Sequence, residues 1–416
     1  MRFGINTLDD IQPCGKTVLL RVDINQPIDR ETNTLKDITR VRACLPTIQE
    51  LSKKGARVVV LAHQGSDIEY KNYYTTQPHT KVLSELLGQE VKFIDDVCGP
   101  AAREAIKALR DGEILLLDNV RFVAEEQTLF EQKLNLTHEQ QADTLMVRKL
   151  APLADLYVCD AFAAAHRDQP SLCGFEQVLP SAMGRLFEEE FCVISGIMEK
   201  PERPCVFMLG GAKVADAFMM MSTVLGNQVA DKVLTGGLVA QILLWAKGDD
   251  IGEASKGFIR KQNYDYLLEM AAQLYEKFKD KIVLPDDFAY VQDGKRFECL
   301  LGSIPQDQMV VDIGVQTSEK YKKIILEAKT VFVNGPMGVF EKAESEFGTR
   351  TLWEALGETS AYTVIGGGDS ITATNKYNKA DKISYICTGG GALIRFLTGE
   401  ELPVVKALRH GSKLKK

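Results

Sequence analysis

Residues 209–217, LGGAKVADA, combine features that could bind phosphate. They follow an apolar run that predicts a buried strand and precede a segment of helix-forming composition. The start of a helix offers free N–H groups, and glycines let a ligand approach the backbone closely. The spacing is not that of a P-loop, because the single Gly-Lys-Thr, at Gly15, lacks the earlier glycine that a P-loop requires, and no GxGxxG occurs. Any phosphate site here is therefore of another kind.

The elements that would position these residues alternate between short β-rich runs and helical patterns. Alternation of near-continuous apolar strands with helices predicts parallel sheets covered on both faces. The expected strands are 17–23, 57–63, 91–95, 113–119, 155–162, 205–210, 232–235, 281–285, 309–313, 330–334, 362–365 and 383–387. These are too many for one compact sheet, so the sequence predicts an α/β fold of two Rossmann-like three-layer domains joined by a hinge helix.

A charged helical segment near the middle of the chain supplies the expected domain boundary. A chain of 416 residues is long enough for two domains of ordinary size. The predicted parts are an N-terminal domain over 1–183, a connecting helix over 184–200, a C-terminal domain over 201–395, and a segment over 396–416 that returns to the N-terminal domain.

Composition restricts the class of protein. The chain is 45% hydrophobic and 26% charged, as globular proteins are, and its formal net charge of −7 argues against nucleic acid or an anionic membrane as the partner. Nine scattered cysteines without a Cys-x-x-Cys pair favour reduced thiols. No signal peptide or membrane span is expected, so the sequence predicts a cytoplasmic protein, either a monomer or a small homo-oligomer.

Different residue types follow the strands in the two halves of the chain. In the first half they are basic or hydrogen-bonding groups, which suit an anion carrying phosphate and carboxylate: Asp23, Asn25, Arg40, His63, Arg121, His166 and Arg167. In the second half they are glycine turns at helix starts with one acid, which suit a nucleotide and its magnesium: Gly210–Lys213, 235–237, 334–341, 366–370 and 388–391.

Each feature has a simpler explanation when taken alone. Asp369 suits a helix N-cap as well as a metal ligand, His166 a core histidine, and Glu341 a solvated residue. Chance would mix the two inventories, however, whereas here they segregate. The pattern therefore predicts a two-substrate site between the domains and leaves the reaction open.

Eight segments taken together resemble the phosphoglycerate kinase family along nearly the whole chain, in family order and spacing. They are RVDIN at 21–25, LLLDNVRF at 115–122, DAFAAAHR at 160–167, LGGAKV at 209–214, LPDD at 284–287, NGPMGVFE at 334–341, GGGD at 366–369 and TGGG at 388–391. NGPMGVFE is highly specific. The variant AAAHRDQPSL at 163–172 is most similar to the archaeal branch.

The resemblance implies reversible, ATP-dependent phosphorylation of the 3-phosphoglycerate carboxylate to 1,3-bisphosphoglycerate, with Mg²⁺ bound with ATP or ADP. The implied phosphoglycerate ligands are Asp23, Asn25, Arg40, His63, Arg121 and Arg167. The implied nucleotide ligands are Gly211, Ala212, Lys213, Gly237, Asn334, Pro336, Val339, Glu341, Gly368 and Ser370. Asp369 would bind the metal, and the catalytic groups would be Arg40, Lys213, Gly367, Gly368 and Gly390. Hinge closure would bring the substrates together and exclude water.

Four places depart from the family pattern. Ser66-Asp67 stands where the family usually has Arg-Pro, Gly196 where it commonly has a connector lysine, and Ala217 where many members carry a second lysine; Ser370 replaces a usual threonine. Lys71 or Lys81 could compensate for the lost arginine. The departures leave open a related kinase that acts on a different carboxylate, and a non-catalytic nucleotide sensor. The sensor has little need of the retained Arg40, Lys213 and Asp369.

Overall fold

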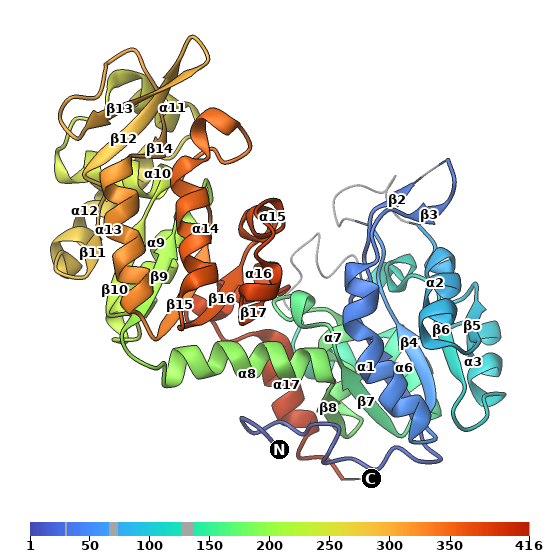
Figure 1. Ribbon diagram of the computed structural model, residues 1–416. Helices are drawn as coiled ribbons and strands as arrows, with labels where there is room; N and C mark the ends of the chain where they lie inside the picture. The colour runs from blue at the N-terminus through green and yellow to red at the C-terminus, as the bar shows by residue number, and fades with distance from the viewer. Residues whose placement is uncertain (30, 66–73, 127–135, 416) are drawn as a thin grey trace. The chain divides into compact units, whose positions relative to one another are not determined.

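The computed structural model describes residues 1–29, 31–65, 74–126 and 136–415 (Figure 1). It divides into two compact units: unit 1 comprises 1–192 with 401–416, and unit 2 comprises 193–400. The division falls inside helix α8 (Arg185–Glu199), which occupies most of the segment expected to connect the domains.

Unit 1 is built on a six-stranded parallel sheet of order β5-β6-β4-β1-β7-β8. Its strands are β1 (Thr17–Arg21), β4 (Arg57–Leu61), β5 (Val91–Ile94), β6 (Ile114–Leu117), β7 (Leu156–Cys159) and β8 (Ser181–Met183). All residues of β1, β6 and β7 are buried. Such continuous burial is typical of central parallel strands, which pack against helices on both faces. A short hairpin, β2 (Ile28–Asp29) with β3 (Thr34–Leu35), stands apart from the sheet.

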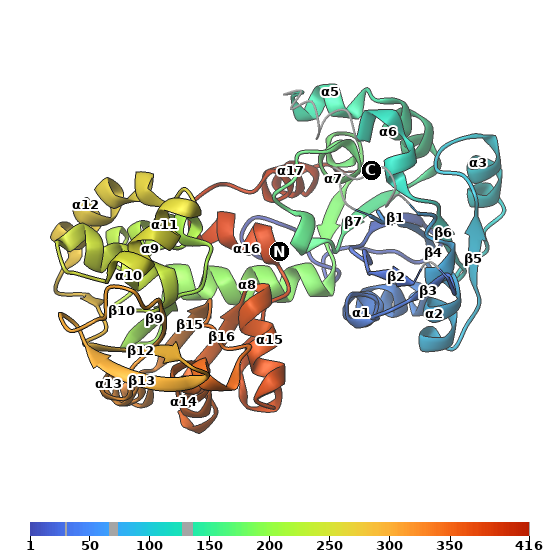
Figure 2. The same cartoon turned by 90° about the horizontal axis from the view of Figure 1, so that it is seen from above.

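Helices cover both faces of this sheet (Figure 2). α1 (Thr39–Lys53) and α2 (Gln77–Leu87) lie on one side. The other side carries α5 (His138–Ala142), α6 (Leu145–Leu150), α7 (Pro170–Cys173) and the C-terminal α17 (Pro403–Gly411), while α3 (Pro100–Lys107) packs near β5 and β6. α1 buries Val41, Cys44, Ile48 and Leu51, the three-to-four-residue spacing of one helix face.

Unit 2 repeats the plan with a six-stranded parallel sheet of order β11-β10-β9-β15-β16-β17. Its strands are β9 (Cys205–Leu209), β10 (Lys232–Thr235), β11 (Ile282–Val283), β15 (Thr330–Asn334), β16 (Tyr362–Gly366) and β17 (Tyr385–Ile386). The α/β class with parallel sheets in two domains is thereby confirmed.

The helices of unit 2 also divide between two faces (Figure 2). α9 (Val214–Gly226), α10 (Gly237–Lys247) and α12 (Leu268–Phe278) lie on one side, and α13 (Val315–Glu327) and α14 (Phe347–Glu358) on the other. α11 (Glu253–Lys261) packs on α10, α15 (Gly368–Lys376) on α14, and α16 (Gly390–Leu397) on α9. In the described parts of the chain, no helix has both the length and the apolar character to cross a membrane.

One sequence expectation is wrong in unit 2. Residues 309–313 do form a strand, β14 (Val310–Ile313), but it belongs to a separate antiparallel sheet with β12 (Asp287–Gln292) and β13 (Lys295–Leu300). The apolar-run criterion missed β12 and β13 because β13 is largely exposed and carries charged residues. Asp293 and Gly294 connect the two strands, with φ of 50° and 72°. Asp-Gly is a typical two-residue hairpin turn, so this pair was the sequence feature that could have predicted the hairpin.

Candidate active site

The predicted basic residues of unit 1 gather at the carboxyl ends of its strands. The chain runs from β1 toward β4 on one side and returns as β7 on the other, so the β1–β7 boundary is a topological switch point. Open α/β sheets bind ligands at such points. Arg21 ends β1, His63 follows β4, and Arg121 lies in the 3₁₀ turn Val120–Phe122 after β6.

Four arginines surround His63, and we call this group the arginine cluster: Arg21, Arg40, Arg121 and Arg167 with His63. Burial, and then the charges of Arg21, Arg121, Arg167 and Arg40, lower the pKa of His63 well below its ordinary 6.5. Burial and the neighbouring Arg167 and Arg21 lower the pKa of Arg121 to about 9. The cluster therefore carries an excess of positive charge, and a multiply charged anion bound there would relieve the repulsion between the arginines.

The tautomer of His63 follows from its contact with Arg21. Arg21 Nη2 lies 3.2 Å from His63 Nδ1, and a guanidinium can only donate. Since His63 is neutral, Nδ1 accepts and the proton is on Nε2. His63 is therefore fixed as a neutral hydrogen-bond donor within the arginine cluster.

Asp23 and Asn25 brace the cluster. Arg40 Nη1 donates to Asp23 Oδ2 at 2.7 Å, and the Asn25 amide N–H donates to Asp23 Oδ1 at 3.1 Å. The Asn25 side chain and Gly65 exchange two hydrogen bonds, of 3.2 and 3.0 Å, and Arg121 Nη1 also donates to the Gly65 carbonyl. The structure thus brings the six predicted phosphoglycerate ligands into one hydrogen-bonded and electrostatic group.

Sequence reasoning missed the support behind this group. Ser171 Oγ accepts from Arg21 Nε at 3.0 Å and donates to the buried Glu126 at 2.5 Å, while the Ser171 N–H donates to Glu126 at 2.9 Å. Burial raises the pKa of Glu126, opposed by Arg21. Arg21 belongs to one of the eight segments and Ser171 to the variant at 163–172, but Glu126 belongs to neither.

In unit 2 three of the five predicted turns, 210–213, 334–341 and 366–370, contribute to one pocket, at the switch point between β9 and β15. We call it the glycine pocket. The space between the turns, including its open mouth, is about 400 Å³. It is lined by Gly210, Gly211, Ala212, Lys213, Asn334, Gly335, Gly367, Gly368, Asp369, Ser370 and Ile394.

Close backbone approach explains the glycines. A Cβ on Gly210 would lie 2.2 Å from the Pro336 carbonyl oxygen, and a Cβ on Gly335, whose φ is +94°, would lie 2.2 Å from the Gly210 oxygen. The Gly211 N–H donates to the Pro336 carbonyl and the Gly237 N–H to the Met337 carbonyl, both at 2.8 Å. The loops after β9, β10 and β15 are thus tied together through their backbones, which leaves no room for side chains.

The polar groups at the pocket are helix starts and two exposed charges. α9 begins directly after Lys213, and α15 begins at Gly368, with Gly367 as its N-cap at φ +89°. Lys213 and Asp369 are exposed. Free helix N–H groups, a lysine and a carboxylate that can hold a cation together form an environment for a polyphosphate and its metal.

Five predicted residues lie outside the residues that line the glycine pocket: Gly237, Pro336, Val339, Glu341 and Gly390. The Pro336 carbonyl accepts from the Gly211 N–H, whereas Gly237 donates to Met337 and its neighbour Leu238 donates to the Gly211 carbonyl. Val339 and Glu341 are exposed on the loop after β15, and Gly390 begins α16, one turn before Ile394 of the pocket wall. Ser370 is fully buried, and its Oγ accepts from the Gly335 N–H at 2.7 Å, so this hydroxyl joins two loops.

Sequence reasoning also missed Tyr264. Its hydroxyl donates to the Ala212 carbonyl at 2.8 Å, next to Lys213, from a position 52 residues away along the chain. Periodicity and motifs gave no signal for this contact, because it depends on how the segment after α11 packs.

Comparison with known proteins shows the family of the chain. The sequence profile described as phosphoglycerate kinase matches residues 8–400. The chain belongs to the phosphoglycerate kinase family. Proteins named phosphoglycerate kinase from Methanothermobacter thermautotrophicus and Thermococcus kodakarensis are 47% and 46% identical, over 98% and 95% of this chain and 97% and 95% of theirs. The resemblance to the archaeal branch is confirmed.

Solved structures of phosphoglycerate kinase are similar along the whole chain. The enzyme from Pyrococcus horikoshii OT3 superposes with a TM-score of 0.86 at 41% identity, covering 98% of this chain and 99% of that one. The enzyme from Coxiella burnetii gives 0.84 at 30% identity, covering 98% and 100%.

Some departures from the phosphoglycerate kinase pattern can be located. Ser66, Asp67 and Lys71 lie outside the described residues. Gly196 is exposed on α8 with open space where a Cβ would stand, and Ala217 is buried on α9. Lys81 is exposed on α2.

Proposed function

We propose that the chain transfers the γ-phosphoryl group of ATP reversibly to the carboxylate of 3-phosphoglycerate, giving 1,3-bisphosphoglycerate and ADP. The observation that carries the proposal is the separation of two complementary sites: four arginines around a neutral histidine in unit 1, and the glycine pocket with Lys213 and Asp369 in unit 2. The first suits an acid with a phosphate, and the second suits a nucleotide. Acyl phosphate formation by direct transfer needs both.

The acceptor is assigned to the arginine cluster. Arginines donate to phosphate and carboxylate oxygens in paired geometry, and charge-assisted hydrogen bonds are the stronger kind. Arg121 and Arg167 suit the phosphate group of the acceptor, and neutral His63 adds a donor from Nε2. Asp23 and Asn25 hold Arg40 and the Gly65 loop in place.

The nucleotide is assigned to the glycine pocket. Backbone amides near Gly211, Gly367 and Gly368 face its phosphates, and Gly237, Pro336, Val339 and Glu341 are assigned to the adenosine, with Glu341 on the ribose as the family resemblance implies. Asp369 fits a magnesium ligand, because it is an exposed carboxylate on the pocket wall and magnesium prefers oxygen ligands shared with phosphates. When bound, the ion supplies neutralisation of phosphate charge.

Phosphoryl transfer depends mainly on positioning the two substrates and neutralising the charge of the transferring phosphoryl group. The acceptor carboxylate is ionised at neutral pH, so no general base is required. One carboxylate oxygen forms a bond to the γ-phosphorus as the bond to the β–γ bridging oxygen breaks, and the electron pair leaves with ADP. Lys213, Arg40 and the amides of Gly367, Gly368 and Gly390 are assigned to the charge on the transferring group. Because acceptor and donor are assigned to different units, transfer requires the two units to bring their ligands together.

The test is a coupled assay of the purified chain with MgATP and 3-phosphoglycerate, in which acyl phosphate is reduced by glyceraldehyde-3-phosphate dehydrogenase with loss of NADH. Turnover that disappears in Lys213→Ala and Arg40→Ala supports the proposal. Absence of turnover in a chain that still binds ATP by calorimetry contradicts it, and turnover with another carboxylate would identify a related kinase instead.

A further inference from the structure

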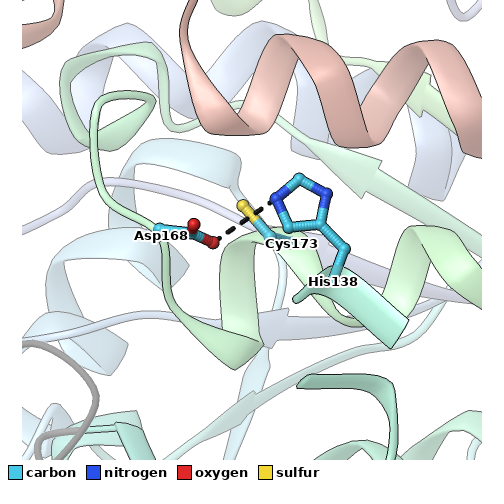
Figure 3. Close-up of side chains that lie close together, drawn as sticks. All are labelled: His138, Asp168 and Cys173. Carbon is cyan, nitrogen blue, oxygen red and sulfur yellow. Dashed lines mark ion pairs between the residues drawn. The ribbon is translucent and has the colours of Figure 1, made fainter. Parts of the chain in front are cut away.

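Three side chains of unit 1 that the proposed reaction does not use converge on one point: His138, Asp168 and Cys173 (Figure 3). His138 is the first residue of α5, Asp168 precedes α7, and Cys173 ends α7. Each offers one potential ligand atom, and these atoms all lie within 4.8 Å of one another. Imidazole nitrogen, carboxylate oxygen and thiolate sulfur are the ligands typical of zinc in proteins.

The spacing is close to that of a coordination shell. Tetrahedral zinc, with bonds of about 2.0–2.3 Å, places its ligand atoms roughly 3.3–3.8 Å apart. His138 Nε2 already lies 3.4 Å from Asp168 Oδ1. A shift of about 1 Å at most would bring the Cys173 sulfur into the same shell.

The local fold holds these residues in place. A capping box between Thr137 and Gln140 fixes the start of α5 and with it His138. Gln141 Nε2 donates to Asp168 Oδ1 at 2.5 Å, and the Cys173 thiol makes a long, weak hydrogen bond of 3.8 Å to the Arg167 carbonyl. The imidazole and carboxylate are therefore preorganised, and the thiol loses only a weak hydrogen bond when it binds a cation.

A pocket gives access and leaves a coordination position open. It is lined by Leu136, Thr137, His138, Glu139, Asp168, Gln177, Lys406 and His410. The side chains of His138 and Asp168 are 13% and 49% exposed, whereas Cys173 is buried. A cation would enter from the pocket and meet the thiol as its innermost ligand, with water or His410 of α17 on the open side.

We propose that His138, Asp168 and Cys173 form a binding site for a borderline-soft divalent cation, zinc above all. A nitrogen and a sulfur ligand exclude magnesium and calcium as the preferred ions. Burial, and then Glu176 and Asp168, raise the pKa of Cys173 well above its ordinary value, so the thiol keeps its proton until a cation displaces it. One proton is then released for each ion bound.

Cobalt(II) titration of the metal-stripped full chain, without nucleotide, tests the proposal. We expect one cobalt per chain with a thiolate-to-cobalt charge-transfer band, abolished by added zinc and absent from Cys173→Ala. His138→Gln should also lose the band, and Asp168→Asn should bind at least about tenfold more weakly. Cys14→Ser is the matched control, because Cys14 is an exposed thiol outside the cluster, and it should keep the band.

Two results would overturn the site. One is a wild-type chain without the charge-transfer band, and the other is a Cys173→Ala chain that keeps it at full strength, which would place the ion on other thiols. If circular dichroism shows that Cys173→Ala is unfolded, the test passes to His138→Gln, whose side chain is partly exposed. Retention of the charge-transfer band in His138→Gln contradicts the assignment.

Discussion

The arginine cluster and the glycine pocket occupy equivalent places, at the switch points of two similar sheets, yet they present positive charge by opposite means. Unit 1 uses charged side chains, which crowd until the pKa of Arg121 falls to about 9. Unit 2 offers the N-termini of α9 and α15, on loops packed so closely that a Cβ at Gly210 or Gly335 would lie 2.2 Å from a backbone oxygen. The first is sensitive to losing a side chain, and the second to gaining one.

Lys213→Ala gives the largest expected effect. Among the described residues that line the glycine pocket, Lys213 is the sole cation. Unit 2 therefore places in one side chain the positive charge that unit 1 distributes over four arginines. We expect kcat to fall by about 100- to 1000-fold, the usual loss for one group that stabilises transition-state charge, with the Kd for ATP nearly unchanged. Steady-state kinetics and calorimetry measure the two. A loss confined to ATP affinity would make Lys213 a binding group only.

Gly335→Ala tests the claim that unit 2 is broken by an added side chain. The new Cβ meets the Gly210 carbonyl, and φ of +94° is strained for alanine, so we expect the free energy of unfolding to fall by about 1–3 kcal/mol and nucleotide binding to weaken. Chemical denaturation measures the first. The matched control is Gly226→Ala in α9, where nothing lies near the added Cβ and a gain of about 0.5–1 kcal/mol is expected. Equal effects at both glycines would refute the steric argument.

Arg121→Ala tests the complementary claim for unit 1. Losing charge-assisted contacts should cost about 1.5–3 kcal/mol, which is roughly 10- to 100-fold in the Kd for 3-phosphoglycerate, while ATP affinity stays constant. Calorimetry with each ligand provides the measurement. Arg110→Ala, at a side chain 85% exposed and remote from the cluster, should change neither affinity. A parallel loss of ATP affinity in Arg121→Ala would mean that the two sites are not independent.

His63→Gln gives the smallest expected effect, on the pH dependence of stability. The folded chain keeps His63 neutral because burial and the arginines lower its pKa, whereas the unfolded chain protonates it below about pH 6.5. The unfolded state then binds more protons, so stability falls as pH decreases through and below 6.5. Denaturation between about pH 5 and 7.5 should show a shallower fall in His63→Gln. An unchanged slope would place the acid sensitivity elsewhere.

Much of the architecture could be predicted because central parallel strands are apolar along their whole length. β10 and β15 match their predicted bounds, and most other sheet strands differ by one or two residues at the ends. The approach missed β12 and β13; the exposed charged residues of β13 resemble a loop when apolar runs are the criterion.

The sequence by itself determined which residues meet at each sheet edge. Arg21, His63 and Arg121 are far apart along the chain, but parallel strands bring their carboxyl ends to one edge, so residues that follow strands must converge. The same logic assembled Gly211, Asn334 and Asp369. The roles assigned to the individual site residues, Gly237, Val339 and Glu341 included, stay predictions.

Only the tertiary structure decided contacts that depend on packing at atomic distances. It fixed the tautomer of His63 through Arg21, braced Arg21 through Ser171 and Glu126, and placed the Tyr264 hydroxyl on Ala212. It also brought Cys173 to His138 across two short helices. Hydrophobic periodicity cannot predict such contacts, because they arise from the angles at which loops and helices pack. A difference of about an ångström in the distance between two side chains decides whether they form a hydrogen bond or share a metal ion.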